Sequence, residues 1–493
     1  MTNIFIFTGN VKLSSFRKFS HLSTPKDLNL FITTHMLFDF EKKTLIDLFP
    51  NADFKTFADF LTDAECKEID ERAYQQEKND SFKSCLRAIA LKNQRIASEI
   101  VLNKKDFRGF VLSDDLGVDC KVWKRYGFHS LKGDYYYLEG KSKLKEILKS
   151  IPLLYQFYKF IKSPKKRITI DRVSVAEYLG RKIIFIGKMN RISRNLEIEF
   201  AESNFERDKI NRNEFYKKNE AQYLLTMHES GCNPIPDSSE YDVRFVQDGY
   251  LPPNYTALNL KFKPKNVQYY AWDKIGKKAY DAQSVPVEIL PFRKKLYLAE
   301  PQFPKELKTV LISATCAGPW SALINPSDDD ILIEAIAQTA RKYSDITFIY
   351  RPHPACVHPM HTGVHTIARI AEYFSYLNLP NLRLSTNVPS QDMQHFSLTF
   401  SNTSLLEDIH AADLIISEYS YSLVEGAIEG KVFASVNLTN RRNFYQAVSD
   451  LGFPHCNSVQ ELWDLLDNFH SLSFIEEYTS AVRNYNAMLD IEE

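Results

Sequence analysis

Short apolar segments alternate with segments of helical periodicity through the second half of the chain. The apolar segments have the length of buried strands, and the segments between them carry apolar residues three and four positions apart, as amphipathic helices do. The expected strands are residues 308–314, 345–350, 381–385, 413–420 and 431–438, and the expected helices are residues 327–342, 365–377, 404–412, 422–430 and 458–469. This alternation predicts a doubly wound parallel sheet with helices on both faces.

The first half of the chain is less regular. Strand-like segments occur near residues 3–9, 28–34, 109–115, 181–188 and 241–249, and a long helical pattern covers residues 80–103. We expect a second Rossmann-like domain with insertions, which ends near residues 290–307, where proline and charged residues are mixed. The predicted fold class is α/β, with an N-terminal Rossmann-like domain over residues 1–295 and a C-terminal one over residues 296–493, facing each other across a cleft.

The composition excludes several classes of protein. The 62 Lys and Arg residues balance 62 Asp and Glu residues, and a net charge of zero does not suit a general nucleic-acid binder. With only 16 Gly residues, a Gly-rich phosphate loop is not expected, and the seven scattered Cys residues indicate reduced thiols. The first ten residues resemble a strand more than a signal peptide, and no apolar segment reaches 18 residues. We therefore expect a cytoplasmic protein.

Candidate binding residues follow the predicted strands, because ligands of doubly wound sheets bind at the carboxyl ends of the strands. Arg351 and His353 follow the strand at 345–350, and the prolines at 352 and 354 restrict the backbone around the imidazole. Either side chain can donate to a phosphate or stabilise a departing nucleotide. The alternative is a structural loop with a surface histidine.

A second candidate site lies between the strand at 413–420 and the helix that follows it. Ser420 and Ser422 stand at the start of this helix, where hydroxyls and unbonded backbone N–H groups favour an anion such as a nucleotide phosphate. Glu425, one turn later, is placed to accept from ribose hydroxyls. Ordinary N-capping by Ser420 is the alternative, and it is compatible with phosphate binding.

Two further loops are candidates. Asp248 and Gly249 follow the strand-like segment DVRFV, where a carboxylate can act as a base or a nucleophile, although Asp-Gly is also a common turn. Thr315 and Gly318 belong to the loop after the strand at 308–314, which we expect to face the cleft and contact the nucleotide; a plain connecting loop is the alternative.

Taken in order, these motifs resemble those of bacterial GT-B glycosyltransferases that use CMP- or CDP-activated donors. The segments are VQDGY, RPHP and, some sixty residues later, DLIISEYSYSLVEGAIEGK, within roughly residues 240–440. Such proteins include sialyltransferases, β-Kdo transferases of capsule and O-antigen synthesis, and CDP-glycerol polymerases of teichoic acid. The sequence departs from their pattern in two places, because Tyr421 separates the two serines and Gln247 stands where a second carboxylate is common.

The resemblance implies roles for individual residues. His353 would assist the CMP leaving group, Ser420 would bind its phosphate, and Glu425 would lie near the ribose. Asp248 would be the catalytic carboxylate, either as general base for inversion or as nucleophile for retention.

The resemblance also implies a function. The expected activity is transfer of Kdo, sialic acid or a related nonulosonic acid from a CMP-activated donor to a cell-surface polysaccharide or a lipid-linked glycan. The alternatives are a CDP-glycerol or CDP-ribitol phosphotransferase and a catalytically inactive GT-B scaffold. No cofactor or metal is expected, because the acidic run at residues 328–330 is read as compensation of a helix dipole.

A basic segment offers one further partner. Residues 141–167 contain nine Lys and Arg residues and one acid, interleaved with apolar and aromatic residues. Such a segment can lie on an anionic membrane surface, which would place the protein peripherally at the inner membrane. A core helix with a solvated basic face is the alternative.

Overall fold

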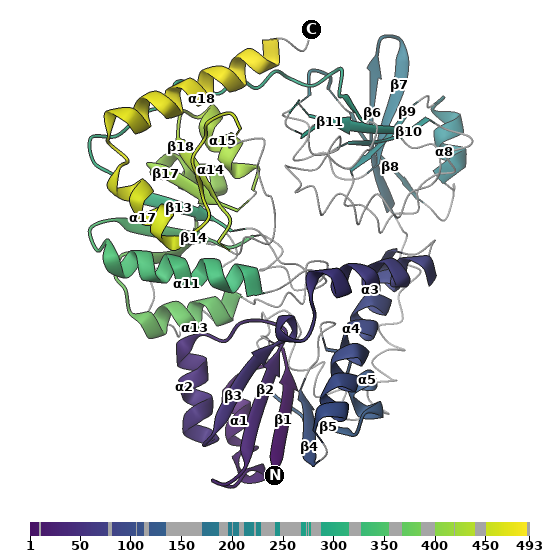
Figure 1. Ribbon diagram of the computed structural model, residues 1–493. Coiled ribbons are helices and arrows are strands. Elements are labelled where there is room, and N and C mark those ends of the chain that lie inside the picture. The colour runs from purple at the N-terminus through teal and green to yellow at the C-terminus, as the bar shows by residue number, and fades with distance from the viewer. Residues whose placement is uncertain are drawn as a thin grey trace.

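The computed structural model describes two all-parallel sheets and a third, mixed sheet (Figure 1). The described residues are 1–8, 11–76, 81–104, 106–112, 118–134, 170–186, 196–199, 201–206, 212–220, 223–227, 242–246, 268–272, 274, 276–277, 287–314, 327–353, 367–385, 400–418, 420–438 and 450–490.

The C-terminal unit is built on a seven-stranded sheet of order β16-β15-β14-β13-β17-β18-β19, in which every pairing is parallel. Its strands are β13 (Thr309–Ser313), β14 (Thr347–Arg351), β15 (Leu382–Ser385), β16 (Phe400–Ser401), β17 (Leu414–Ser417), β18 (Val432–Val436) and β19 (His455–Cys456). From β13 the chain builds one side of the sheet through β16 and then the other side from β17. The order therefore reverses between β13 and β17, which makes this point the topological switch of a Rossmann-like sheet.

The helices of this unit agree with the apolar periodicity of the sequence. They are α11 (Ser327–Lys342), α13 (Ile367–Leu377), α14 (Leu405–Ala411), α15 (Ser422–Ile428), α17 (Val459–Asp467) and α18 (Leu472–Asp490). Ser404 and Ser458 cap α14 and α17, each accepting a backbone N–H three residues later at 3.2 Å. Gly430, with φ 77°, ends the turn after α15, where other residues would be strained.

The N-terminal unit contains a five-stranded parallel sheet of order β3-β2-β1-β4-β5. Its strands are β1 (Thr2–Phe7), β2 (Leu28–Thr33), β3 (Ala52–Thr56), β4 (Phe107–Leu112) and β5 (Phe128–Ser130). Its helices are α1 (Ser14–Arg17), α2 (Asp39–Leu48), α3 (Asp63–Gln76), α4 (Ser81–Asn103) and α5 (Cys120–Arg125), with short 3₁₀ turns at Ser20–Leu22 and Phe57–Asp59. The predicted fold class is confirmed, because both ends of this α/β chain form Rossmann-like parallel sheets.

A middle unit lies between them in the sequence. Its strands are β6 (Ile170–Tyr178), β7 (Arg181–Ile186), β8 (Ala201–Glu206), β9 (Tyr223–Met227), β10 (Asp242–Val246), β11 (Gln268–Ala271) and β12 (Val287–Ile289), and α8 covers Arg212–Lys218. Their order is β12-β11-β10-β9-β7-β6-β8, with β6 antiparallel to both of its neighbours. Residues 1–295, expected to form one domain with insertions, thus contain two separate sheets. The boundary expected at residue 295 stays a prediction.

The N-terminal and C-terminal units share one hydrophobic core, whereas the middle unit has its own. Buried residues of β1, such as Phe5, belong to the same cluster as Ile312 of β13 and Ile370 of α13. The middle cluster, which includes Trp272 and Phe292, is distinct from it. In Figure 1, α2 of the N-terminal unit lies next to α13, which shows where the two units join.

A buried ion triad fastens this junction. The Arg369 guanidinium on α13 donates from Nε and Nη2 to Glu41 of α2, at 2.9 and 2.7 Å, and from Nη1 to Asp330 of α11 at 2.8 Å. Its side chain is completely buried and lies over the ring of Phe38, 4.3 Å from the centroid. That ring stacks on Tyr373 with centroids 4.0 Å apart. Asp330 pairs with Arg369 inside the C-terminal unit, and across the junction it accepts the Met36 N–H at 3.0 Å. Its interpretation as simple helix-dipole compensation is therefore incomplete.

The triad has one cation for two carboxylates, and the pKa values of Asp330 and Arg369 are shifted. Burial raises the pKa of Asp330 to about 6, and attraction to Arg369 offsets only part of that effect. Although burial alone lowers the pKa of Arg369, its attraction to Glu41 and Asp330 raises it overall. Arg369 therefore stays charged while Asp330 titrates near neutral pH.

We expect the stability contribution of Asp330 to fall as the pH rises. Because its folded-state pKa of about 6 exceeds the ordinary value of 3.8, the native state binds the proton more tightly than the unfolded state. The contribution is greatest below pH 4 and is lost as the pH rises to 6. Urea unfolding of the wild type and Asp330→Asn at several pH values measures it. The difference between them should change by on the order of 3 kcal/mol. A constant difference would contradict the expectation.

Candidate functional site

The carboxyl ends of β13, β14 and β17 lie side by side at the switch point of the C-terminal sheet. The Ser417 hydroxyl at the end of β17 donates to the Ser313 carbonyl at the end of β13, at 2.6 Å. On the other side, the Ala314 N–H donates to the Arg351 carbonyl at 2.9 Å. These bonds hold three strand ends together, and the loops that carry His353 and Ser420 leave from them.

The connection from β17 to α15 places Ser420 and Ser422 directly after this edge. The Ser420 N–H donates to the Ser417 hydroxyl at 3.2 Å, and the Ser420 hydroxyl accepts the N–H of Ser422 at 3.3 Å. Tyr421, rather than Ser420, occupies the N-cap position of α15. The Ser422 hydroxyl is buried and has no hydrogen-bonding partner among the described residues. A buried polar group without a hydrogen bond lowers the stability of the fold by about 1–3 kcal/mol, and a ligand that hydrogen-bonds to it would remove this cost.

Close packing fixes the position of α15. A Cβ atom at Gly426 would stand 2.1 Å from Cδ1 of Ile415 on β17, so a larger residue there would require the end of the Ile415 side chain to move. Glu425 lies one turn into α15, and its side chain is half-buried. Its predicted contact with a ribose stays a prediction.

Arg351 is the centre of an internal network. Its Nη1 atom donates to the Asp408 carboxylate at 2.5 Å, to the Ser385 hydroxyl at 3.1 Å and to the Thr403 carbonyl at 3.0 Å. Asp408 also accepts from the hydroxyls of Ser385 and Thr403, each at 2.5 Å. Asp408 is buried, so the network joins the ends of β14 and β15 to α14. This role was not predicted. The hydrogen bonds of the Nη1 atom are therefore made within the protein.

His353 stands two residues beyond the end of β14 and is half-buried. Since β14 pairs with β13, and β13 with β17, its loop leaves from the same edge as Ser420. Asp248, Thr315 and Gly318 lie outside the described residues. Strand β10 ends at Val246, two residues before Asp248, and it pairs in parallel with β11, whose end is followed by Trp272.

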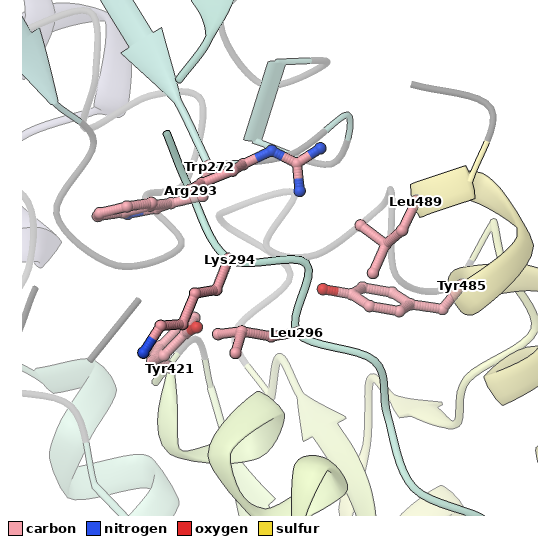
Figure 2. Close-up of a pocket in the computed structure, with 7 residues that line it drawn as sticks. All are labelled: Trp272, Arg293, Lys294, Leu296, Tyr421, Tyr485 and Leu489. Carbon is pink, nitrogen blue, oxygen red and sulfur yellow. The ribbon is translucent and has the colours of Figure 1, made fainter. Parts of the chain in front are cut away.

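An open hollow lies where the middle unit meets the C-terminal unit (Figure 2). It is partly open to solvent, with enclosed room for little more than a water molecule, and we call it the linker hollow. It is lined by Trp272, Arg293, Lys294, Leu296, Tyr421, Tyr485 and Leu489. Because Tyr421 separates Ser420 from Ser422, the hollow adjoins the start of α15. Because Trp272 follows β11, it also adjoins the carboxyl edge of the middle sheet.

The sequence indicated few of these lining residues. Arg293 and Lys294 belong to the charged segment FRKK, which was read only as part of a domain boundary. Tyr485 is on α18, which packs against the linker between β12 and β13 through contacts distant in sequence. The Asn486 side chain accepts the Leu298 N–H at 2.8 Å and donates to the Leu298 carbonyl at 2.9 Å. The three adjacent cations of this segment, between two predicted domains, were the one signal in the sequence.

The described part of the chain shows neither a metal centre nor a spanning helix. Within it, no three His, Cys, Asp or Glu side chains are grouped so that they could hold a metal ion. In the same residues, none of the helices has the length and apolar character that crossing a membrane requires. The basic segment 141–167 lies outside the described residues.

No protein-family model and no curated protein matches the sequence. Solved structures that match include the S. aureus MnaA–UDP co-structure, at 8% identity and TM-score 0.32, covering 98% of this chain and 90% of that one. A putative UDP-N-acetylglucosamine 2-epimerase from Listeria monocytogenes matches at 8% identity and TM-score 0.29, with coverages of 98% and 92%. A glycosyltransferase from Rickettsia africae matches at 11% identity and TM-score 0.26, with coverages of 100% and 94%. Such low values do not indicate which reaction this chain performs.

Proposed function

We propose that the protein is a glycosyltransferase that binds a nucleotide-activated sugar at the switch point of the C-terminal sheet. The observation that supports this most directly is the meeting of three strand ends, with the loops of His353 and Ser420 leaving from one edge. Open α/β sheets bind ligands at this position. The buried hydroxyl of Ser422, which has no partner among the described residues, adds an unused polar group beside it.

The proposed donor is a CMP-activated acidic sugar: Kdo, sialic acid or a related nonulosonic acid. The acceptor is a hydroxyl of a cell-surface polysaccharide or a lipid-linked glycan. This choice depends on the likeness of VQDGY, RPHP and SEYSYS to motifs of CMP-sugar transferases. Transfer would take place in the cytoplasm or at the inner membrane surface, with residues 141–167 as the membrane contact.

The reaction breaks the bond between the anomeric carbon and the CMP phosphate oxygen and forms a bond from that carbon to the acceptor oxygen. His353 donates to the departing phosphate and stabilises its charge. In a direct displacement, Asp248 accepts the proton of the acceptor hydroxyl. In a two-step reaction with retention, the same carboxylate attacks the anomeric carbon instead. Neither course uses a metal ion.

A thermal-shift panel of CMP, CDP, UDP, GDP and ADP tests the donor assignment. Ligands that bind only the native state raise the melting temperature by mass action, and a ligand at 100 times its Kd stabilises by about 2.7 kcal/mol. We expect the largest shift with CMP. A shift with UDP or GDP and none with cytidine nucleotides would contradict the assignment. If CDP-glycerol serves as donor and Asp248→Ala keeps activity, the protein is a phosphotransferase, and no transfer with any donor would indicate a scaffold.

A further inference from the structure

The position of His353 depends on a short segment that begins at the end of β14. The Arg351 carbonyl accepts the Ala314 N–H at 2.9 Å, so the backbone before His353 is tied to the end of β13. Pro352 is buried, and its ring restricts the backbone between Arg351 and His353. Because this one restricted residue separates them, a shift of Arg351 would move the imidazole as well.

Asp408 is the anion that holds the Arg351 side chain. It lies on α14, and its carboxylate accepts from Nη1 of Arg351 at 2.5 Å. The Arg351 side chain is 11% exposed and that of Asp408 is 3% exposed, so the pair is shielded from water. Loss of one partner from such a buried pair leaves the other charge uncompensated, which favours rearrangement of the residue that remains.

Two hydroxyl groups orient the carboxylate. Ser385, at the end of β15, donates to Oδ2 of Asp408, and Thr403, which follows β16, donates to Oδ1. The Ser385 hydroxyl and the Thr403 carbonyl also accept from Nη1 of Arg351. Both carboxylate oxygens are therefore engaged, and the ion pair is held in one geometry. Because α14 is followed by β17, the same carboxylate also lies on the segment that leads to Ser420.

We propose that Asp408 is a positioning residue of the site, which fixes the end of β14 through Arg351 and thereby holds the His353 imidazole where it meets the departing phosphate. This inference rests on the proposed function, which gives His353 its role, and it adds a residue that the sequence motifs did not include. Asp408 contacts neither donor nor acceptor in this assignment. Misplacement of a reacting group by about 1 Å can lower a rate about 100-fold, so a buried support of this kind affects the rate.

The test follows the His353 imidazole directly, by NMR of the full-length protein with ¹³C-labelled histidine rings. The chain has 12 His residues, and the signal that disappears in His353→Ala identifies the relevant one. Asp408→Asn keeps the shape of the side chain and removes its charge. We expect this variant to move the His353 signal without ligand and to reduce the shift that CMP causes to less than half of the wild-type value.

Two further measurements support the same test. Ser385→Ala removes one hydroxyl from the network and keeps the ion pair, so it should move the His353 signal in the same direction by a smaller amount. With a CMP-activated acidic sugar as donor, Asp408→Asn should lower kcat by about 10- to 100-fold and change CMP affinity less than about threefold. In the His353→Ala background, Asp408→Asn should cause no further loss of kcat.

Asp70→Asn is the matched control. Asp70 on α3 pairs with Lys92 on α4 at 3.2 Å, and their side chains are 10% and 7% exposed. The substitution thus breaks an ion pair of similar burial in the N-terminal unit. It should lower the melting temperature, as Asp408→Asn does, but leave the His353 signal and its response to CMP unchanged.

The outcomes separate this inference from the proposed function. If the His353 signal and its response to CMP are the same in Asp408→Asn and the wild type, the inference is wrong and the proposed function stands. If CMP leaves the wild-type His353 signal unchanged while Asp408→Asn moves it, the positioning is supported and the proposed role of His353 is wrong. If Asp70→Asn moves the signal as much as Asp408→Asn, the effect is a general loss of stability and the inference is wrong. An equal further loss of kcat in the His353→Ala background would show that Asp408 acts independently of His353, which also overturns it.

Discussion

Replacement of Arg369 by alanine should lower the free energy of unfolding by about 3–5 kcal/mol. Among the described residues, the guanidinium is the one cation paired with Glu41 and Asp330, and its side chain is completely buried. Without it, two carboxylates are left in a dry environment, and the Met36 carbonyl loses the bond that it accepts from Nη2 at 2.9 Å. Urea or thermal unfolding monitored by circular dichroism measures the loss.

Two controls show whether the loss comes from the broken triad. Arg341→Ala removes an exposed arginine from α11 and should change stability by less than about 0.5 kcal/mol. Combining Arg369→Met, Glu41→Leu and Asp330→Leu in one variant would remove the charges as a set, so this triple variant should be much more stable than Arg369→Ala. If the stability of Arg369→Ala is within about 1 kcal/mol of the wild type, the triad does not hold the two units together.

Replacement of His353 by alanine should reduce sugar transfer by about 100- to 10,000-fold at saturating donor. The expected loss is in kcat, because the imidazole stabilises charge that develops on the phosphate as the bond to the sugar breaks. CMP affinity should change much less, because in the proposed site the serines at the start of α15 supply the ground-state contacts. Product formation from a CMP-activated acidic sugar, measured with the acceptor present, gives both values.

His470→Ala is the matched control for this prediction. His470 is exposed in the turn between α17 and α18, so its removal should leave both transfer and stability nearly unchanged. If His353→Ala transfers sugar at the wild-type rate, the imidazole has no part in the departure of CMP. If the variant loses CMP binding to the same extent as activity, His353 is a binding residue instead.

The N-terminal and C-terminal sheets were predicted in large part, because most of their strands are marked locally. The short strands β3, β5, β16 and β19 were not expected. Segments such as residues 308–314 are apolar on both faces, as the strands of a covered parallel sheet must be. Caps at Ser404 and Ser458 and the stop at Gly430 also depend on neighbouring residues only. The middle sheet was harder, because two of its strand-like segments were found but not recognised as belonging to a separate sheet.

The candidate site also has features that the sequence predicted and features that it did not. The positions of Ser420 and His353 after their strands could be predicted, since parallel strands bring their carboxyl ends to one edge. The pairing of Arg351 with Asp408, 57 residues later, could not be predicted. An arginine at the end of a strand can either bind a ligand or form an internal ion pair, and the sequence pattern is the same in both cases. The sequence likewise explained Asp330 as an acidic residue in the first turn of a helix. Its ion pair with Arg369, on another helix, is seen only in the structure.

The sequence by itself determined most strands of the two parallel sheets, several of their helices and the strand ends where polar residues gather, because each depends on periodicity and short-range hydrogen bonding. Only the tertiary structure decided how the charges are used. It buried Arg369 between two units, tied Arg351 to Asp408 and placed Lys294 beside Tyr421. Ion pairs and hollows form between segments far apart in the chain. Their partners depend on packing in three dimensions, which local patterns do not specify.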